Sequence, residues 1–174
     1  MLSQAEHDRF ASSILVTISS KLAKEVDMEL EKQLSILSTK DIAKASLDNF
    51  GGAIIVKDID EAFDVVNEFA PEHLEIMIND EKLLSKVKNA GAVFFGEYSV
   101  EAAGDYCSGP NHVLPTNQFA KVRAGLNVMD FLKMPTVQKI SKKGLLNLSK
   151  SIITLAKVEG LEAHSKSVEV RDET

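Results

Sequence analysis

Residues 51–70 read GGAIIVKDIDEAFDVVNEFA and change their periodicity halfway along. Residues 53–56 are continuously apolar and mostly β-branched, which is typical of a strand. Asp58-x-x-Glu61 then begins a stripe of apolar residues at helical spacing. Pro71 ends this stripe, because the residue before a proline is disfavoured in the α region. The stretch therefore predicts one strand followed by one amphipathic helix.

The same alternation precedes this stretch. Residues 13–18 form an aliphatic run, and a pair of serines then offers N-caps to an amphipathic helix that extends to Leu34. Ser38-x-x-Asp41 resembles a capping box and predicts a second helix, which the glycines at 51–52 end. A strand and two helices are thus expected before the next strand.

The alternation also continues downstream. Residues 74–78 alternate like a short strand, and Asn79 is expected to cap a helix through residues 83–87. Gly91 then precedes the strand-like residues 92–95. Alternating strands and helices are typical of α/β domains in which helices cover a mostly parallel sheet. The sequence therefore predicts a layered, incomplete Rossmann-like α/β fold.

The last part of the chain is less regular. Residues 96–116 contain three glycines and two prolines and predict a long loop, which is often functional. Residues 137–140 are expected to form another strand, and an apolar stripe over 145–155 predicts a helix that ends near Gly160. We place a boundary near Pro135, which predicts an α/β domain over 1–134 and a small helical segment over 135–174.

Composition excludes several classes of protein. The chain has 174 residues, of which 44% are hydrophobic, and this suits a compact domain with a core. Its net charge of -6 disfavours a nucleic-acid or anionic-lipid partner. The single cysteine, Cys107, cannot close an intramolecular disulfide, which favours a cytoplasmic setting. Neither an export signal nor a membrane anchor is expected.

The four histidines each lie near another ligand or acid–base group. The first such pair is three positions apart, so a helix would place both side chains on one face, where they could bind one ion. A solvated first turn is the alternative for that pair. The four pairs are Gln4 with His7, Glu72 with His73, Asp105 with His112, and Glu159 with His164.

The other three pairs also allow two interpretations each. Glu72 and His73 follow a helix end, where side chains can point into a cleft and transfer protons, or can form a polar turn in water. Asp105 lies in a glycine-rich stretch suited to metal or substrate binding, or to an Asx-type turn. Glu159 and His164 flank Gly160. They could act as a ligand or acid–base pair, or they could simply be charged residues at a helix end.

Together these segments resemble the histidinol dehydrogenase family. The resemblance lies in four strings that span nearly the whole chain in order, and the pattern GDYxSGxNHVLPT, which residues 104–116 match, is highly specific to that family. The four strings are LSQAEHD at 2–8, APEHLEI at 70–76, GAVFFGEYSVEAAGDYCSGPNHVLPT at 91–116 and EGLEAH at 159–164.

The resemblance implies roles for individual residues. It implies that Gln4, His7, Asp105 and His164 bind zinc and also lie close to the substrate. It implies that Glu72 and His73 form the acid–base pair and that His73 contacts the substrate. It also implies substrate contacts for Glu159 and His112.

The resemblance further implies the reaction. The family oxidises L-histidinol twice, through an aldehyde level, to L-histidine in histidine biosynthesis, and reduces two NAD molecules. His73 is expected to accept the alcohol proton and Glu72 to activate water, while zinc orients the substrate. The carboxy-terminal segment is expected to cross to a partner subunit in a homodimer.

The resemblance also leaves a part of the enzyme unaccounted for. Family members are much longer than this chain, and the NAD-binding part is expected upstream of it, because no G-x-G-x-x-G follows a predicted strand. We therefore expect the chain to be inactive without an amino-terminal half. The alternative is a non-catalytic, dimeric protein that binds zinc or imidazole.

Overall fold

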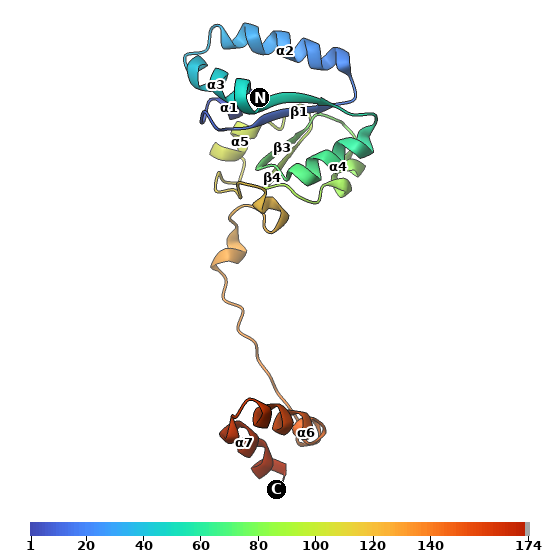
Figure 1. Cartoon of the computed structure of the whole chain (residues 1–174), viewed down its shortest axis with the longest axis vertical. Helices are drawn as coiled ribbons and strands as arrows, with labels where there is room; N and C mark the ends of the chain where they lie inside the picture. The colour runs from blue at the N-terminus through green and yellow to red at the C-terminus, as the bar shows by residue number, and fades with distance from the viewer. Residues whose placement is uncertain (173–174) are drawn as a thin grey trace. The chain divides into compact units, whose positions relative to one another are not determined.

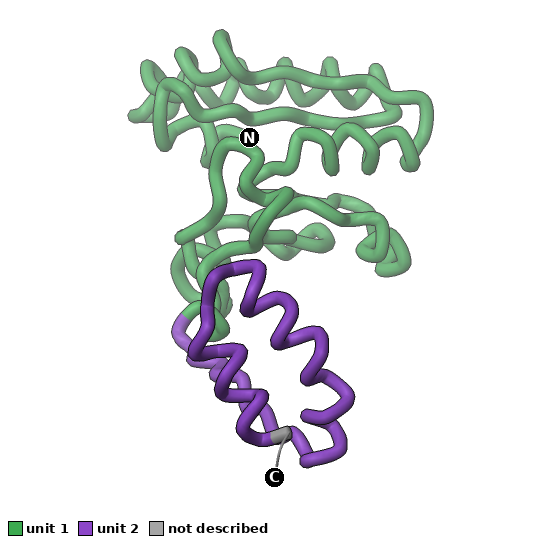
Figure 2. Tube along the Cα trace, turned by 60° about the horizontal axis from the view of Figure 1, so that its bottom comes forward, with its two compact units in different colours: residues 1–130 green, residues 131–174 purple. Residues whose placement is uncertain are grey.

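The chain divides into two compact units, Met1–Asp130 and Phe131–Thr174, in a computed structural model that describes residues 1–172 (Figure 2). The first unit contains all the strands of the described residues and mixes them with helices. The second unit is a pair of helices. The predicted α/β class is therefore confirmed.

Four short strands form two parallel pairs in the first unit. Strand β1 (Ser13–Thr17) pairs with β2 (Gly51–Ile55), with Ser13 opposite Gly51. Strand β3 (His73–Ile76) pairs with β4 (Ala92–Phe95), with His73 opposite Ala92. The four strands predicted within this unit and their parallel direction are correct, but their hydrogen bonds form two two-stranded sheets and not one sheet.

Helices connect the parallel strands and cover them. Helices α2 (Ser20–Leu34) and α3 (Lys40–Phe50) join β1 to β2, and α4 (Ile59–Phe69) joins β2 to β3. Figure 1 shows α2 on one side of β1 and α4 on the other, and both helices contact that strand. These crossovers follow from the parallel pairing, since a tight hairpin cannot connect parallel strands.

The ends of α4 follow the sequence signals closely. The Asp58 carboxylate accepts a hydrogen bond from the backbone N–H of Glu61 at 2.8 Å, and the Glu61 carboxylate accepts one from the N–H of Lys57 at 2.7 Å. Ala70 ends the helix in the left-handed conformation, one residue before Pro71. Local signals therefore set both ends of the helix, polar side chains at its start and Pro71 just after its end.

Two predicted helix starts are wrong. Thr39, and not Ser38, is the N-cap of α3, and its hydroxyl donates to Glu6 Oε2 at 2.7 Å instead of capping the helix. That hydrogen bond links the first helix, α1 (Leu2–Ala5), to α3. The helix expected after Asn79 is a 3₁₀ helix, η1 (Glu81–Lys86), and Asp80 caps it.

The core of the first unit lies between α4 and the β3–β4 pair. Phe63 of α4 packs against Leu74 and Ile76 of β3, and all three are buried. Partly buried side chains complete this cluster, among them Val87 and Phe95. This packing fixes the position at which β3 begins.

Residues 96–116 are more ordered than the sequence predicts. Helix α5 (Glu101–Tyr106) lies within them, and Gly104 lets it approach β4, because a Cβ on Gly104 would lie 2.6 Å from Cε1 of Phe94. Two short 3₁₀ helices follow, η2 (Phe119–Lys121) and η3 (Val128–Phe131). A helix of six residues that contains glycine has too weak a periodic signal for sequence-based detection.

The second unit consists of α6 (Lys142–Val158) and α7 (Glu162–Asp172). The predicted helix over 145–155 is confirmed, and Gly160 follows it with a φ of 71°. The strand expected over 137–140 is wrong: no described strand includes these residues, and Val137 is 93% exposed. No helix in residues 1–172 is long and apolar enough to cross a membrane.

Candidate metal and acid–base site

His73 occupies the centre of the candidate site, at the first position of β3. Its Nδ1 atom lies 3.0 Å from Oε1 of Gln4, which is 69 residues earlier in the sequence and belongs to α1. An amide oxygen can only accept a hydrogen bond, so the Nδ1 atom of His73 carries the proton in this contact. In the neutral imidazole, the other ring nitrogen, Nε2, then has the lone pair that can accept a proton.

Two carboxyl groups of α5 face this second nitrogen. His73 Nε2 lies 3.6 Å from Oε1 of Glu101 and 4.0 Å from Oδ1 of Asp105. The backbone N–H of Glu101 donates to Oε1 of Glu75 at 3.1 Å, which attaches the start of α5 to β3. The ring of His73 also lies against that of Phe94, with 6.0 Å between centroids. Strand β3 and helix α5 together therefore hold the site.

His7 joins the same cluster. One potential ligand atom from each of His7, Glu101 and Asp105 lies within 4.8 Å of the other two. His7 is exposed, whereas Glu101 is buried, so the cluster extends from the interior to the surface. One imidazole and two carboxylates form a donor set that suits zinc.

The cluster contains polar atoms whose bonding is incomplete. Glu101 Oε1 and His73 Nε2 are both buried, and neither has a hydrogen-bond partner. Burial raises the pKa of Glu101, and so do the hydrogen bond to Asp105 and the charge of that residue, whereas His73 and His7 lower it. Unpaired buried polar atoms are costly, and a bound cation or substrate would satisfy them. The residues present therefore fit a metal ion.

The remaining predicted site residues lie outside this cluster. The Glu72 side chain directly precedes β3 and forms no hydrogen bond or ion pair within residues 1–172. His112 is exposed in the loop after α5. Glu159 is the C-cap of α6, and His164 lies in α7, with both side chains exposed on the second unit. The structure thus brings Gln4, His7, His73 and Asp105 together.

Glu101 is the residue of the cluster that sequence reasoning missed. The available signal was its spacing from Asp105, since residues four apart share one face of a helix. That signal was hidden because residues 96–116 were expected to form a loop. Recognition of α5 would have placed both carboxyls on one side.

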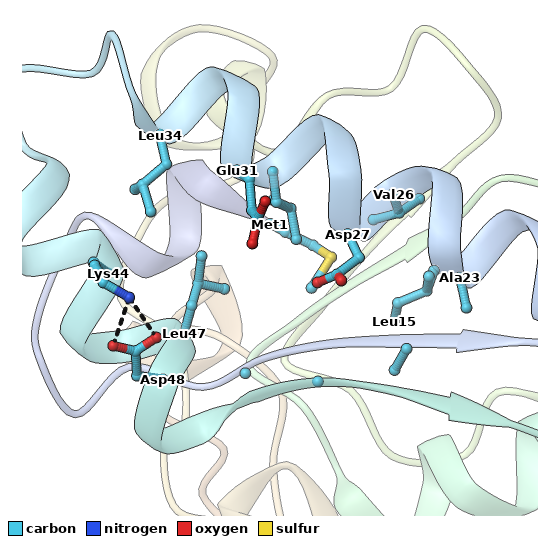
Figure 3. Close-up of a pocket in the computed structure, with 14 residues that line it drawn as sticks. Met1, Leu15, Ala23, Val26, Asp27, Glu31, Leu34, Lys44, Leu47 and Asp48 are labelled. Atoms are coloured by element: carbon cyan, nitrogen blue, oxygen red, sulfur yellow. Dashed lines mark hydrogen bonds and ion pairs between the residues drawn. The ribbon is translucent and has the colours of Figure 1, made fainter.

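A separate hollow of about 230 Å³ lies between α2, α3 and the β1–β2 pair (Figure 3). Leucines line much of it, and an ion pair between Lys44 and Asp48, 2.9 Å long, lies at its side. None of the residues of the His73 cluster lines this hollow. It is therefore distinct from the candidate site.

Comparison with known proteins decides the family. The sequence model of the family described as histidinol dehydrogenase matches residues 1–172. The chain belongs to the histidinol dehydrogenase family. Histidinol dehydrogenases from Lactococcus lactis and Caldanaerobacter subterraneus are 49% and 51% identical to it, each over 98% of this chain.

The fold is also that of a histidinol dehydrogenase. The crystal structure of histidinol dehydrogenase from Elizabethkingia anophelis is 39% identical and superimposes with a TM-score of 0.88 over 99% of this chain. The chain spans only 40% of the length of that structure and of the two relatives. The family is one of oxidoreductases, and this chain corresponds to less than half of a full-length member.

Proposed function

We propose that this chain supplies the zinc, substrate and acid–base groups of a histidinol dehydrogenase, which oxidises L-histidinol to L-histidine by a four-electron, NAD-linked reaction in histidine biosynthesis. The observation that carries this proposal is the convergence of Gln4, His7, His73 and Asp105 on one partly buried cluster in a member of the family. These residues come from α1, the segment after it, β3 and α5, so their convergence depends on the fold.

Gln4, His7 and Asp105 are the residues of the first unit that would hold zinc. His164 would complete the ligand set, as the family resemblance implies. When bound, zinc would supply a positive centre that fixes the imidazole and amine of the substrate. The unpaired buried atoms of His73 and Glu101 support a site built for an additional charged or polar group.

His73 would act as the base. The contact between Gln4 Oε1 and Nδ1 orients the imidazole and leaves Nε2 to accept the hydroxyl proton of the alcohol as hydride leaves the adjacent carbon. At the aldehyde level, Glu72 would take a proton from water as the water oxygen bonds to the carbonyl carbon. Two NAD molecules, bound one after the other, would each supply the acceptor for one of the two hydrides.

The second unit would complete the substrate site. Glu159 and His164 would reach it as part of the segment 135–174, exchanged with the partner in a homodimer, while His112 would contact the substrate from the loop after α5. The amphipathic helix α6 supports such an exchange, because it exposes leucines, among them Leu148 and Leu155, that another surface could cover.

NAD would bind to a part of the enzyme outside this chain. The chain spans 40% of the length of its relatives, which leaves a substantial part of the family's structure to supply the NAD site. Strand β2 supports an association with that part, because Ile54 and Ile55 are exposed and all-parallel sheets normally have both faces covered. The isolated chain is therefore expected to bind zinc without oxidising histidinol.

The proposal is tested by reconstitution. The chain is mixed with the separately produced amino-terminal part of a close relative, and NADH absorbance is followed with zinc and histidinol. We expect turnover in the mixture, and its loss in Glu72→Gln and in His73→Asn, while Glu97→Gln, on an exposed carboxylate, serves as the matched control.

Zinc binding by the chain is measured in parallel. His7→Asn and Asp105→Asn are expected to abolish tight zinc binding. Zinc binding without turnover in any mixture would support the alternative, a non-catalytic protein that binds zinc or imidazole. Absence of both zinc binding and turnover would contradict the proposal.

A further inference from the structure

Among residues 1–171, whose burial the structure describes, Glu101 is the only acidic or basic side chain that is buried, with 7% of its surface exposed. Its backbone is fixed by the hydrogen bond to Glu75, and its side chain points into the His73 cluster. A buried carboxyl is costly unless its oxygens are hydrogen-bonded, yet Oε1 of Glu101 has no hydrogen-bond partner in the described part of the chain. Stability of the fold alone therefore does not account for this residue.

The neighbours of Glu101 show where it acts. Its carboxyl lies beside two groups of the proposed reaction: one of its oxygens is within 4.8 Å of a carboxylate oxygen of Asp105, and Oε1 lies 3.6 Å from Nε2 of His73. Gln4 holds the opposite edge of the same imidazole. Carboxylates that orient ligands and bases from behind commonly tune metal sites.

We propose that Glu101 is a positioning residue of the site, which holds the Asp105 carboxylate and the His73 imidazole in the arrangement that a bound zinc ion and the substrate require. This inference rests on the proposed function and adds to it a residue that the family resemblance did not assign. Although the Glu101 carboxyl lies among the potential donor atoms, the proposal leaves the ligand positions to Gln4, His7, Asp105 and His164, and Glu101 acts through Asp105 and His73.

If Glu101 has this role, its replacement should lower metal affinity without lowering the stability of the metal-free chain. Glu101→Gln keeps the shape of the side chain and removes a buried ionisable group, so the metal-free chain should be as stable as wild type or more stable. The loss of the carboxylate should lower zinc affinity by roughly 10- to 100-fold, as for other residues that support metal ligands. A residue with a merely structural role would instead lower stability and leave zinc affinity unchanged.

The experiment uses the full chain and Zn²⁺ or Co²⁺ alone. Zinc affinity is measured by competition with a chromophoric chelator, and unfolding by urea is measured after removal of metal. The Co²⁺ absorption spectrum reports the ligand set, and we expect Glu101→Gln to keep the shape of that spectrum. Glu97→Gln removes an exposed carboxylate four residues earlier and should change none of the three readouts.

Three outcomes would overturn the inference. If Glu101→Gln bound zinc as tightly as wild type, the proposed positioning role would be wrong. A loss of stability with unchanged affinity would make Glu101 structural, and a Co²⁺ spectrum typical of a lost ligand would make it a direct ligand. Failure of wild type itself to bind zinc would instead contradict the proposed function, on which the inference rests.

Discussion

At the scale of single residues, the site depends on contacts that leave atoms free for a ligand. His73 has one nitrogen bonded to Gln4 and the other buried beside Glu101 without a hydrogen bond. A fold selected for stability alone would pair or remove such atoms, because each unpaired polar atom costs free energy. This arrangement predicts a particular response to pH.

The stability of the metal-free chain should depend on the protonation of Glu101. Its pKa is raised above the ordinary value of 4.5 by burial and by Asp105, so the folded state holds this proton more tightly than the unfolded state. The stabilisation is complete below 4.5 and is lost as pH rises through the raised pKa. The free energy of unfolding of Glu101→Gln, relative to wild type, should therefore increase with pH across this window.

Urea unfolding of both proteins at a series of pH values, with a chelator present, measures this difference. Glu97→Gln, which removes an exposed carboxylate outside the cluster, provides the control. A flat difference for Glu101→Gln would contradict a raised pKa in the folded state.

Gly104 should tolerate no side chain. Gly104→Ala would place a Cβ 2.6 Å from the buried Phe94 ring and push α5 away from β4. Overpacking of this kind costs about 1–3 kcal/mol, and the displaced Asp105 should also weaken zinc binding. Gly52→Ala is the matched control, because a Cβ there would meet no atom within 4 Å. Unfolding and chelator-competition measurements of both variants test the expectation.

At the scale of elements, local signals and tertiary contacts contribute differently. The ends of α4 are set by its neighbours in sequence, Asp58 and Pro71, and sequence reasoning located them correctly. The start of α3 was wrong, because the Thr39 hydroxyl is used for a long-range hydrogen bond to Glu6. Helix α5 was missed because packing of Gly104 against Phe94 compensates for a weak helical sequence.

The cap of α4 should have a measurable effect on stability. Asp58→Ala removes the acceptor for the Glu61 N–H and should lower the free energy of unfolding by about 1 kcal/mol. Asp58→Asn should keep most of the wild-type stability, because asparagine is an equally good N-cap. Equal stability of Asp58→Ala and wild type in urea would show that the cap is not needed.

At the scale of the whole molecule, the proposed site requires two subunits. The proposed exchange of the segment 135–174 would give each zinc site His7 from one chain and His164 from its partner. His7→Asn and His164→Asn chains should each lose tight zinc binding, yet a mixture of the two should regain it. Random exchange of subunits restores roughly a quarter of the sites, because only one site of each mixed dimer has both histidines.

Zinc titration of the two variants, alone and after joint refolding, measures this recovery. A His7→Asn and Asp105→Asn pair provides the control, because both ligands belong to the same unit and mixing should restore nothing if each chain supplies both. If a mixture of the His7 and His164 variants did not regain zinc binding, one of two conclusions would follow. Either both ligands of a site come from one chain, or His164 is not a zinc ligand.

The sequence by itself determined the alternation of strands and helices, the ends of α4 and the family motifs. These features depend on residues within a few positions of one another, where periodicity, capping and proline act directly. Only the tertiary structure brought Gln4 and Glu101 to opposite edges of the His73 ring. Those contacts join residues far apart in the chain, and they depend on the parallel pairing of β3 with β4 and on the close approach that Gly104 allows.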